Sequence, residues 1–223
     1  MKIPHLHLPL RKPEDVIPHL GKGELHWKKG RSAYELAYSW GIINDIPKSV
    51  KNVLNSSEVF KDATLVDAFF EREVDLLTSG RPSQTDLMVI LALENELAIM
   101  AVEAKVDEPF GPIVSDWNNQ SLPKIERLNS LCHLLGLNPK EVGNLRYQLL
   151  HRTASAILEA KRYRATKAIM LVQSFDIKKA WIDEFYKFSN KMGFASFEVG
   201  ELSEPLNRKG VDLSLAWCAD KIC

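Results

Sequence analysis

Two acidic side chains stand at the ends of two strongly apolar segments in the middle of the chain. Asp86 directly precedes the apolar run 87–93, and Glu103 directly follows the apolar run 97–102. Only three polar residues, 94–96, separate the runs, so the pattern predicts a hairpin of two buried strands. A turn of two or of four residues gives the same register, in which Asp86 faces Glu103 across the hairpin.

In that register both carboxylates share one face of the sheet with Lys105, which lies two residues beyond Glu103. Facing carboxylates repel each other and need compensation at the end of an apolar strand. A divalent cation provides it, because Mg²⁺ binds one or two carboxylates and completes its shell with water and substrate phosphate oxygens. A partly desolvated Lys105 could orient or help deprotonate an attacking water. The alternative is structural: the acids reach solvent at the strand ends and Lys105 pairs with one of them.

The amino-acid sequence around these residues resembles the motifs of the PD-(D/E)XK nuclease superfamily, which has the restriction-endonuclease-like fold. The resemblance rests on Ser83-Gln84-Thr85-Asp86 followed by Val102-Glu103-Ala104-Lys105, and it covers about residues 58–175. It implies metal-dependent hydrolysis of DNA, with Asp86, Glu103 and the carbonyl of Ala104 holding Mg²⁺, for which Mn²⁺ could substitute. Lys105 would position the attacking water. Thr85 stands directly before Asp86, where the family motif has its proline, although Pro82 is near.

A further acid before the hairpin is usual in such nucleases, and Glu71 and Glu73 compete for this role. If 58–75 were one helix, Glu73 would lie amid its apolar face, whereas a strand beginning near Phe70 favours Glu71. We expect Glu71 to be the additional catalytic acid. The alternative is that both belong to a solvated acidic face.

A helix predicted from Leu145 to about Arg162 follows the hairpin and carries an edge pair, Gln148 and Arg152, beside its apolar stripe. In the resembling family such a helix supplies the site with a Gln or a basic residue, which makes Gln148 a catalytic candidate. Residues 146–167 contain six Lys or Arg against one acid, a charge suited to phosphate contact or to the helix dipole. Arg146, Arg152 and Gln84 are therefore expected to bind substrate, and His151 to lie at the surface.

The remaining patterns predict one α/β domain: a restriction-endonuclease-like core with a central mixed sheet in the order αβββαβ, flanked by helices. We assign residues 1–57 to a basic N-terminal arm and helix, 58–175 to the catalytic core, and 176–223 to a C-terminal helix and strands. Helices are expected at 31–43, from 56 to about 70, at 123–135 and at 178–191. Further strands are expected at 168–172, 194–199 and 211–217.

Composition limits the classes of function. Basic and acidic residues both number 29, so a polyanionic partner must be met by a local patch. The longest apolar run has seven residues, too short to cross a bilayer, and no signal peptide is recognised. Three scattered cysteines predict neither disulfides nor a zinc site, which favours the cytoplasm.

The sequence therefore predicts a Mg²⁺-dependent nuclease whose partner is DNA, without membrane association, in restriction, defence or repair. A homodimer would supply the two sites that cutting both strands requires. Two alternatives stay open: a binding module that keeps the fold without catalysis, and a metal-dependent phosphoesterase acting on small nucleotides, which a closed and non-basic pocket would favour.

Overall fold

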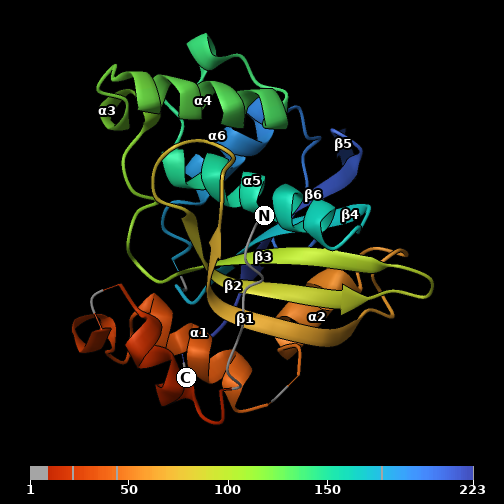
Figure 1. Cartoon of the computed structure of the whole chain (residues 1–223). Helices are drawn as coiled ribbons and strands as arrows, with labels where there is room; N and C mark the ends of the chain where they lie inside the picture. The colour runs from red at the N-terminus through yellow and green to blue at the C-terminus, as the bar shows by residue number, and fades with distance from the viewer. Residues whose placement is uncertain (1–9, 22, 44, 177, 223) are drawn as a thin grey trace.

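A computed structural model describes residues 10–21, 23–43, 45–176 and 178–222 of the chain. The described part is an α/β structure with a six-stranded mixed sheet in the order β1-β2-β3-β4-β6-β5, flanked by helices (Figure 1). The strands pair antiparallel from β1 to β3, parallel from β3 through β4 to β6, and antiparallel between β6 and β5. The elements in chain order are η1 (Pro13–His19), η2 (Gly23–His26), α1 (Ser32–Gly41), α2 (Lys48–Leu54), β1 (Thr64–Val74), β2 (Ser83–Ala92), β3 (Leu97–Lys105), α3 (Val114–Trp117), α4 (Leu122–Leu135), η3 (Pro139–Glu141), α5 (Tyr147–Arg162), β4 (Lys167–Ser174), α6 (Ile182–Met192), β5 (Leu206–Arg208) and β6 (Val211–Ala219).

The sheet has an apolar core on each face, because its central strands are apolar at both odd and even positions. On one face, Met88 and Ile99 belong to a cluster completed by α4, α5 and α6. On the other, Leu87 and Met100 belong to a cluster completed by α1 and α2. Helices therefore cover both faces, and a polar side chain at the end of β2 or β3 must find partners within the fold.

The central hairpin has the predicted register. Leu87 pairs with Val102 and Ala92 with Leu97, which leaves the four-residue connection 93–96. An even connection keeps residues of matching parity on the same face, so Asp86, Glu103 and Lys105 all face α5. The even connection sets this register, because both strands are apolar on both faces and their alternation alone would not exclude a slip by one residue.

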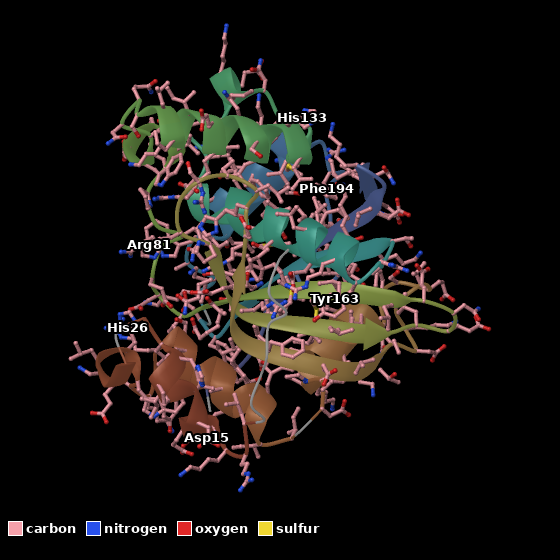
Figure 2. All side chains as sticks on the ribbon, viewed as in Figure 1. Asp15, His26, Arg81, His133, Tyr163 and Phe194 are labelled. Atoms are coloured by element: carbon pink, nitrogen blue, oxygen red, sulfur yellow. The ribbon has the colours of Figure 1, made fainter. Side chains whose placement is uncertain are left out.

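The predicted N-terminal arm packs on the protein with little regular structure. Val16 and Leu20 are buried against Ala37 of α1. Figure 2 shows Asp15 and His26 of this segment at one end of the molecule, and His133 and Phe194 at the other. No helix within the described residues has the length and hydropathy needed to span a membrane.

Two predicted elements are wrong. The helix expected from 56 to about 70 is absent: α2 ends at Leu54, turns follow, and β1 begins at Thr64. The apolar side chains of this stretch belong to an edge strand, whose side chains reach both cores. The strand expected at 194–199 is also absent, because Phe197 packs on the rings of Phe185 and Tyr186 instead of pairing in the sheet. The position beside β6 is taken by β5.

Candidate active site

Three carboxylates form a row across three neighbouring strands. Glu71 belongs to β1, and the flanking pairs Phe70 with Leu87 and Arg72 with Thr85 place it across from Asp86 of β2. Asp86 in turn lies at the position facing Glu103 of β3, one step beyond the pair of Leu87 with Val102 that ends this ladder. The backbone N–H of Ala104 donates a 2.9 Å hydrogen bond to Asp86 Oδ2 and fixes that carboxylate.

Glu71 has an unusual backbone. Its φ of 51° lies in the left-handed region, in the middle of a strand. Such a conformation costs a non-glycine residue on the order of 1–3 kcal/mol and often marks a functional site. At this point the residues of β1 that face α5 change from odd-numbered to even-numbered positions. Phe69 packs into the core on that side before the change, and Val74 packs into it afterwards. The change leaves Glu71 beside Asp86 in the lining of a pocket.

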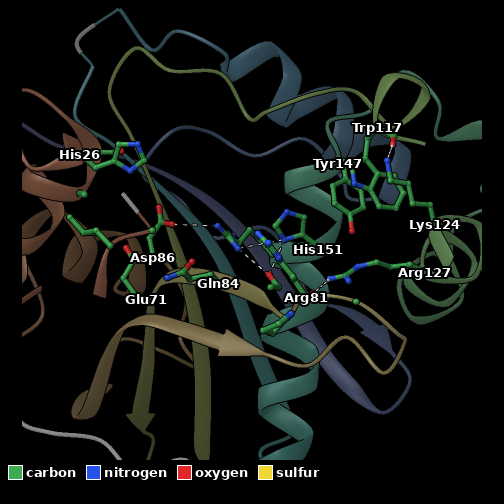
Figure 3. A pocket seen from close by; sticks show the side chains of 18 of the residues that line it. His26, Glu71, Arg81, Gln84, Asp86, Trp117, Lys124, Arg127, Tyr147 and His151 are labelled. Carbon is green, nitrogen blue, oxygen red and sulfur yellow. Dashed lines mark hydrogen bonds and ion pairs between the residues drawn. The ribbon is translucent and has the colours of Figure 1, made fainter. Parts of the chain in front are cut away.

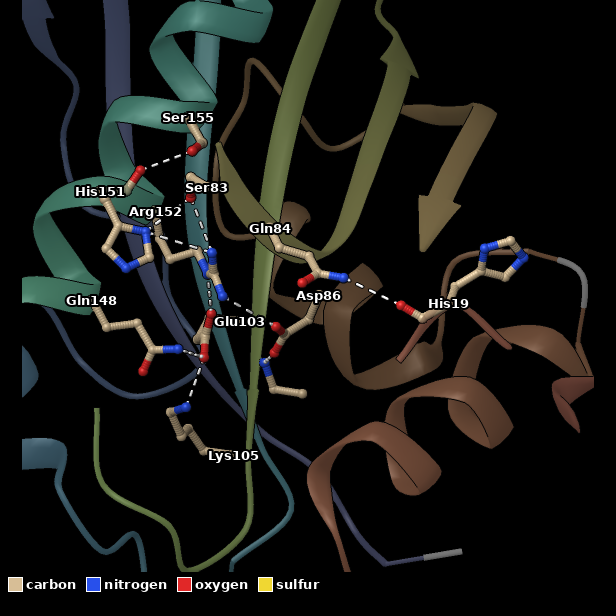
Figure 4. A network of polar contacts seen from close by, with 11 residues as sticks. His19, Ser83, Gln84, Asp86, Glu103, Lys105, Gln148, His151, Arg152 and Ser155 are labelled. Atoms are coloured by element: carbon tan, nitrogen blue, oxygen red, sulfur yellow. Dashed lines mark hydrogen bonds and ion pairs between the residues drawn. The ribbon is translucent and has the colours of Figure 1, made fainter. Parts of the chain in front are cut away.

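Glu103 is buried and is held by three donors (Figure 4). Lys105 Nζ and Gln148 Nε2 both donate to its Oε1 at 2.6 Å. Arg152 Nε donates to its Oε2 at 2.5 Å. The edge pair Gln148 and Arg152 of α5 thus reaches the end of the hairpin, because the apolar stripe of this helix lies on the sheet and turns that edge toward it.

Arg152 also bridges Glu103 to its surroundings. Its Nη2 lies 3.5 Å from Asp86 Oδ1, and its Nη1 donates to Ser83 Oγ at 3.0 Å. With only 7% of its surface exposed, the guanidinium serves as an internal brace between two carboxylates. Arg152 was expected to bind substrate at the Asp86/Glu103 face; it lies at that face, and its contacts there are with the carboxylates and Ser83.

Fully ionised, the row would carry more negative charge than its buried cations compensate, so one of its acids keeps a proton near neutral pH. Three carboxylates face two cations, Lys105 and Arg152. Burial, and then the neighbouring Asp86, raise the pKa of Glu71 to about 8. Burial and Glu103 likewise raise the pKa of Asp86 to about 6. Burial alone would also raise the pKa of Glu103, but Lys105 and Arg152 outweigh it and lower this pKa to about 2.

Lys105 differs from its predicted behaviour as a group that could help to deprotonate water. Burial lowers its pKa, but the charges of Glu103 and then Asp86 outweigh burial and raise it. The ammonium also lies 5.1 Å from the centre of the Phe110 ring. Lys105 is therefore a fixed cation beside the row, suited to orienting a water or stabilising negative charge but not to accepting a proton.

His151 lies between these groups and the pocket, and its hydrogen bonds define its tautomer. Ser83 Oγ is 2.8 Å from Nδ1 of His151 and also accepts from Arg152, whose guanidinium can only donate. Arg152 Nη1, which can only donate, also lies 3.5 Å from Nδ1, so Nδ1 is the unprotonated acceptor and the hydroxyl proton of Ser83 points to it. Burial and the charge of Arg152 lower the pKa of His151 well below 6.5. The neutral imidazole carries its proton on Nε2.

Two carboxylates of the row, Glu71 and Asp86, line a pocket of about 690 Å³, whereas Glu103 is buried behind it (Figure 3). Glu71, Gln84 and Asp86 lie on one side of it, and Trp117, Lys124 and Arg127 on the other, with His151 between them. The N-terminal segment adds Leu20, Gly21 and His26 to the lining. Its charged lining residues are Glu71 and Asp86 against Arg81, Lys124, Arg127 and Arg152, so the pocket is basic on balance.

The remaining predicted site residues have mixed positions. Gln84 lines the pocket, where its Nε2 donates to the carbonyl of His19 at 3.2 Å. Glu73 is exposed outside the pocket lining, so the structure brings Glu71, and not Glu73, to the row. Arg146 is absent from the lining: its Nη1 donates to the carbonyl of Gly111 at 2.8 Å, and its guanidinium lies 5.3 Å from the Trp181 ring centre. It ties the loop before α3 to α6 and offers no support for substrate binding.

Sequence reasoning missed most of the basic wall and misplaced His151. His151 is the neighbour of Arg152 and lies one helical turn from Gln148, so the predicted edge of α5 already contained it. Lys124 and Arg127 stand three residues apart on the predicted helix 123–135, but nothing in the sequence connects that helix to the hairpin. Only the packing of α4 against α5 brings this pair to the pocket.

The donor set fits a divalent cation that binds few protein ligands. Within the described residues, no three His, Cys, Asp or Glu side chains are grouped so that they could hold a metal ion together. Mg²⁺ does not need such a cage, because it commonly uses one or two carboxylates together with waters and substrate phosphates. Asp86 meets this requirement, since among the described residues its Oδ1 has only the 3.5 Å contact to Arg152, and a cation could replace the proton that Glu71 otherwise keeps.

Comparison with known proteins places the chain in a family. Residues 9–222 match the family described as "Domain of unknown function (DUF6946)". The chain belongs to the DUF6946 family. No curated protein matches the chain. No solved structure matches it either. In this DUF6946 member, the argument for function therefore rests on the site itself.

Proposed function

We propose that this protein is a Mg²⁺-dependent nuclease that hydrolyses phosphodiester bonds of DNA. The observation that carries the proposal is the row of Glu71, Asp86 and Glu103 beside Lys105, of which Glu71 and Asp86 line a basic pocket. Helix α2, the three antiparallel strands β1 to β3, α5 and β4 follow each other in the order expected for a restriction-endonuclease-like core, which supports the same proposal.

Each group of the site has a role in this chemistry. Asp86 would hold the cation, with Glu71 and Glu103 on either side. A bound Mg²⁺ or Mn²⁺ would supply charge neutralisation and polarisation of the scissile phosphate. Lys105, fixed by Glu103, would orient the attacking water and stabilise the negative charge that develops on the phosphate. Gln148 and Arg152 would keep Glu103 in place, so that Lys105 does not shift.

The charges of the pocket favour a nuclease over a small-nucleotide phosphoesterase and over a binding module. A phosphoesterase for small nucleotides was expected to show a closed and non-basic pocket, whereas this lining has Arg81, Lys124 and Arg127 against two acids, besides the Arg152 that braces Glu103. A binding module without catalysis would not need the row of carboxylates, which repels a nucleic acid unless a cation neutralises it. The carboxylates and the basic wall together favour phosphodiester hydrolysis.

A cleavage assay tests the proposal. End-labelled single-stranded, duplex and branched DNA are incubated with the protein in Mg²⁺, in Mn²⁺ or in EDTA. We expect cleavage only with a divalent cation, and Asp86→Asn should lower the rate by more than about 100-fold, since several kcal/mol of transition-state stabilisation are lost. Asp67→Asn is the matched control, because Asp67 is an exposed acid on β1, outside the pocket lining.

Thermal melting gives a second reading that does not depend on turnover. A cation that binds only the folded state adds about 1.4 kcal/mol of stability at ten times its Kd. Wild type and Asp67→Asn should gain stability in millimolar Mg²⁺ or Mn²⁺, and Asp86→Asn should lose most of that gain. Absence of both cleavage and a cation-dependent shift in wild type would refute the proposal and leave the binding module.

A further inference from the structure

The wall of the pocket opposite the carboxylates consists of cations that no acid neutralises. Lys124 Nζ donates to the carbonyl of Trp117 at 2.6 Å, and Arg127 Nη2 donates to the carbonyl of Arg81 at 2.7 Å. Both of these acceptors are uncharged. Within the described part of the chain, none of Arg81, Lys124 and Arg127 forms an ion pair with a carboxylate. Their positive charge is available to a ligand in the pocket.

The fold holds these cations in place. The Trp117 ring stacks on the ring of Tyr147 with centroids 3.7 Å apart, and Lys124 Nζ lies 5.3 Å from the Trp117 centroid. Arg127 lies against the turn before β2, where Gly80 has a φ of +115° and a Cβ would meet Arg127 Nη1 at 3.0 Å. Arg127 Nε is buried and has no hydrogen-bond partner. These contacts hold the guanidinium at the pocket lining, where its charge remains available to an anion.

The size and walls of the pocket limit what can reach the carboxylates. Its volume of about 690 Å³ lies in the range of roughly 300–1,000 Å³ that holds one drug-sized ligand, and a nucleotide is of that size. The N-terminal segment closes one side, with Gln84 bonded to His19, and α3 and α4 close the other. A pocket of this volume admits about one nucleotide, which favours a single strand over the much wider base-paired duplex.

We propose that the protein selects single-stranded DNA. Arg81, Lys124 and Arg127 bind the phosphate next to the one that is cleaved. This inference rests on the proposed function, because it names the substrate of the same site. The cations act as an electrostatic guide for the strand, and the carboxylate row across the pocket receives the next phosphate. The neutral Nε2–H of His151, between the two groups, donates to the strand that connects them.

Binding measured without divalent cations tests the inference independently of catalysis. The probe is a fluorescein-labelled single strand of about 12 nucleotides, a length in the range of single-strand site sizes, compared with its duplex in EDTA. Fluorescence anisotropy gives Kd at several salt concentrations. We expect the single strand to bind at least about tenfold more tightly than the duplex, with affinity falling steeply as salt rises.

The double variant Lys124→Gln/Arg127→Gln should weaken single-strand binding by about tenfold or more. It should also reduce the slope of log K against log salt by about 1.4, because each lost phosphate contact removes about 0.7. The control Lys161→Gln/Arg164→Gln removes the same charge at the far end of α5 and should bind like wild type. If circular dichroism shows that the first variant is unfolded, Arg81→Gln in the exposed turn replaces it, with a slope reduced by about 0.7.

Three results would overturn the inference: duplex binding as tight as single-strand binding, an unchanged salt slope in the pocket variants, or equal losses in the control. Failure of the proposed function is distinguishable. A protein that binds single strands through this wall but never cleaves them refutes hydrolysis only. A cation-dependent nuclease that prefers duplex DNA refutes only the selection of single strands.

Discussion

Replacing Arg152 by methionine removes a buried positive charge from between two carboxylates. Glu103, 1% exposed, would keep Lys105 and Gln148 as donors but lose its bond from Arg152 Nε, and Ser83 would lose its donor. Breaking a buried pair on one side costs about 3–5 kcal/mol, because the remaining charge stays buried without its partner. This is a large part of the roughly 5–15 kcal/mol that stabilises a typical domain.

Urea denaturation followed by fluorescence measures this loss. For a slope of about 2–3 kcal/mol per molar urea, the midpoint of Arg152→Met should fall by on the order of 1–2 M. The control is Arg162→Met on the same helix, whose 39% exposed side chain lies 3.6 Å from Glu159. Its loss should cost at most about 1 kcal/mol, because Arg162 is more than a third exposed and the buried Glu159 keeps its bonds from Arg72.

A double variant identifies the cause of the loss. If Arg152 stabilises through Glu103, then Glu103→Gln/Arg152→Met should be at least about 1 kcal/mol more stable than the sum of the two single changes predicts. An Arg152 that serves only to bind substrate would instead be removable at little cost to folding. An Arg152→Met protein within about 1 kcal/mol of wild type, or no less stable than Arg162→Met, would therefore refute the assignment of this residue as a brace.

Two further predictions concern single residues of the site. Because the folded protein keeps the pKa of His151 below 6.5, the imidazole of the unfolded chain takes up a proton first as pH falls. Wild type should therefore lose unfolding free energy relative to His151→Gln below about pH 6.5, and parallel pH curves for the two proteins would contradict this. ¹⁵N NMR near neutral pH should show the Nε2–H tautomer. Glu71→Gln should reduce the gain in melting temperature that Mg²⁺ gives, because it removes a carboxylate from the row, whereas Glu73→Gln should leave this gain unchanged. Equal effects of the two variants would show that the position of Glu71 beside Asp86 has no consequence for binding of the cation.

The sequence by itself determined the central hairpin and the face on which its acids lie. Asp86, Glu103 and Lys105 are close in sequence to two apolar strands, and the even connection between these strands fixes which residues share a face. The same local information determined the helix of Gln148 and Arg152, since its apolar stripe fixes which edge overlooks the sheet. These features depend on periodicity, which a single sequence contains.

Tertiary structure decided what the periodicity left open. The choice between Glu71 and Glu73 depended on a left-handed residue within β1, which no composition rule predicts. The false helix at 56–70 arose because an edge strand with side chains in two cores imitates helical spacing. The role of Arg152 as a brace, and the arrival of Lys124 and Arg127 opposite the carboxylates, depend on contacts between residues far apart in the chain. Such contacts are set by how the helices pack on the sheet, so the residue types were readable in advance and their partners were not.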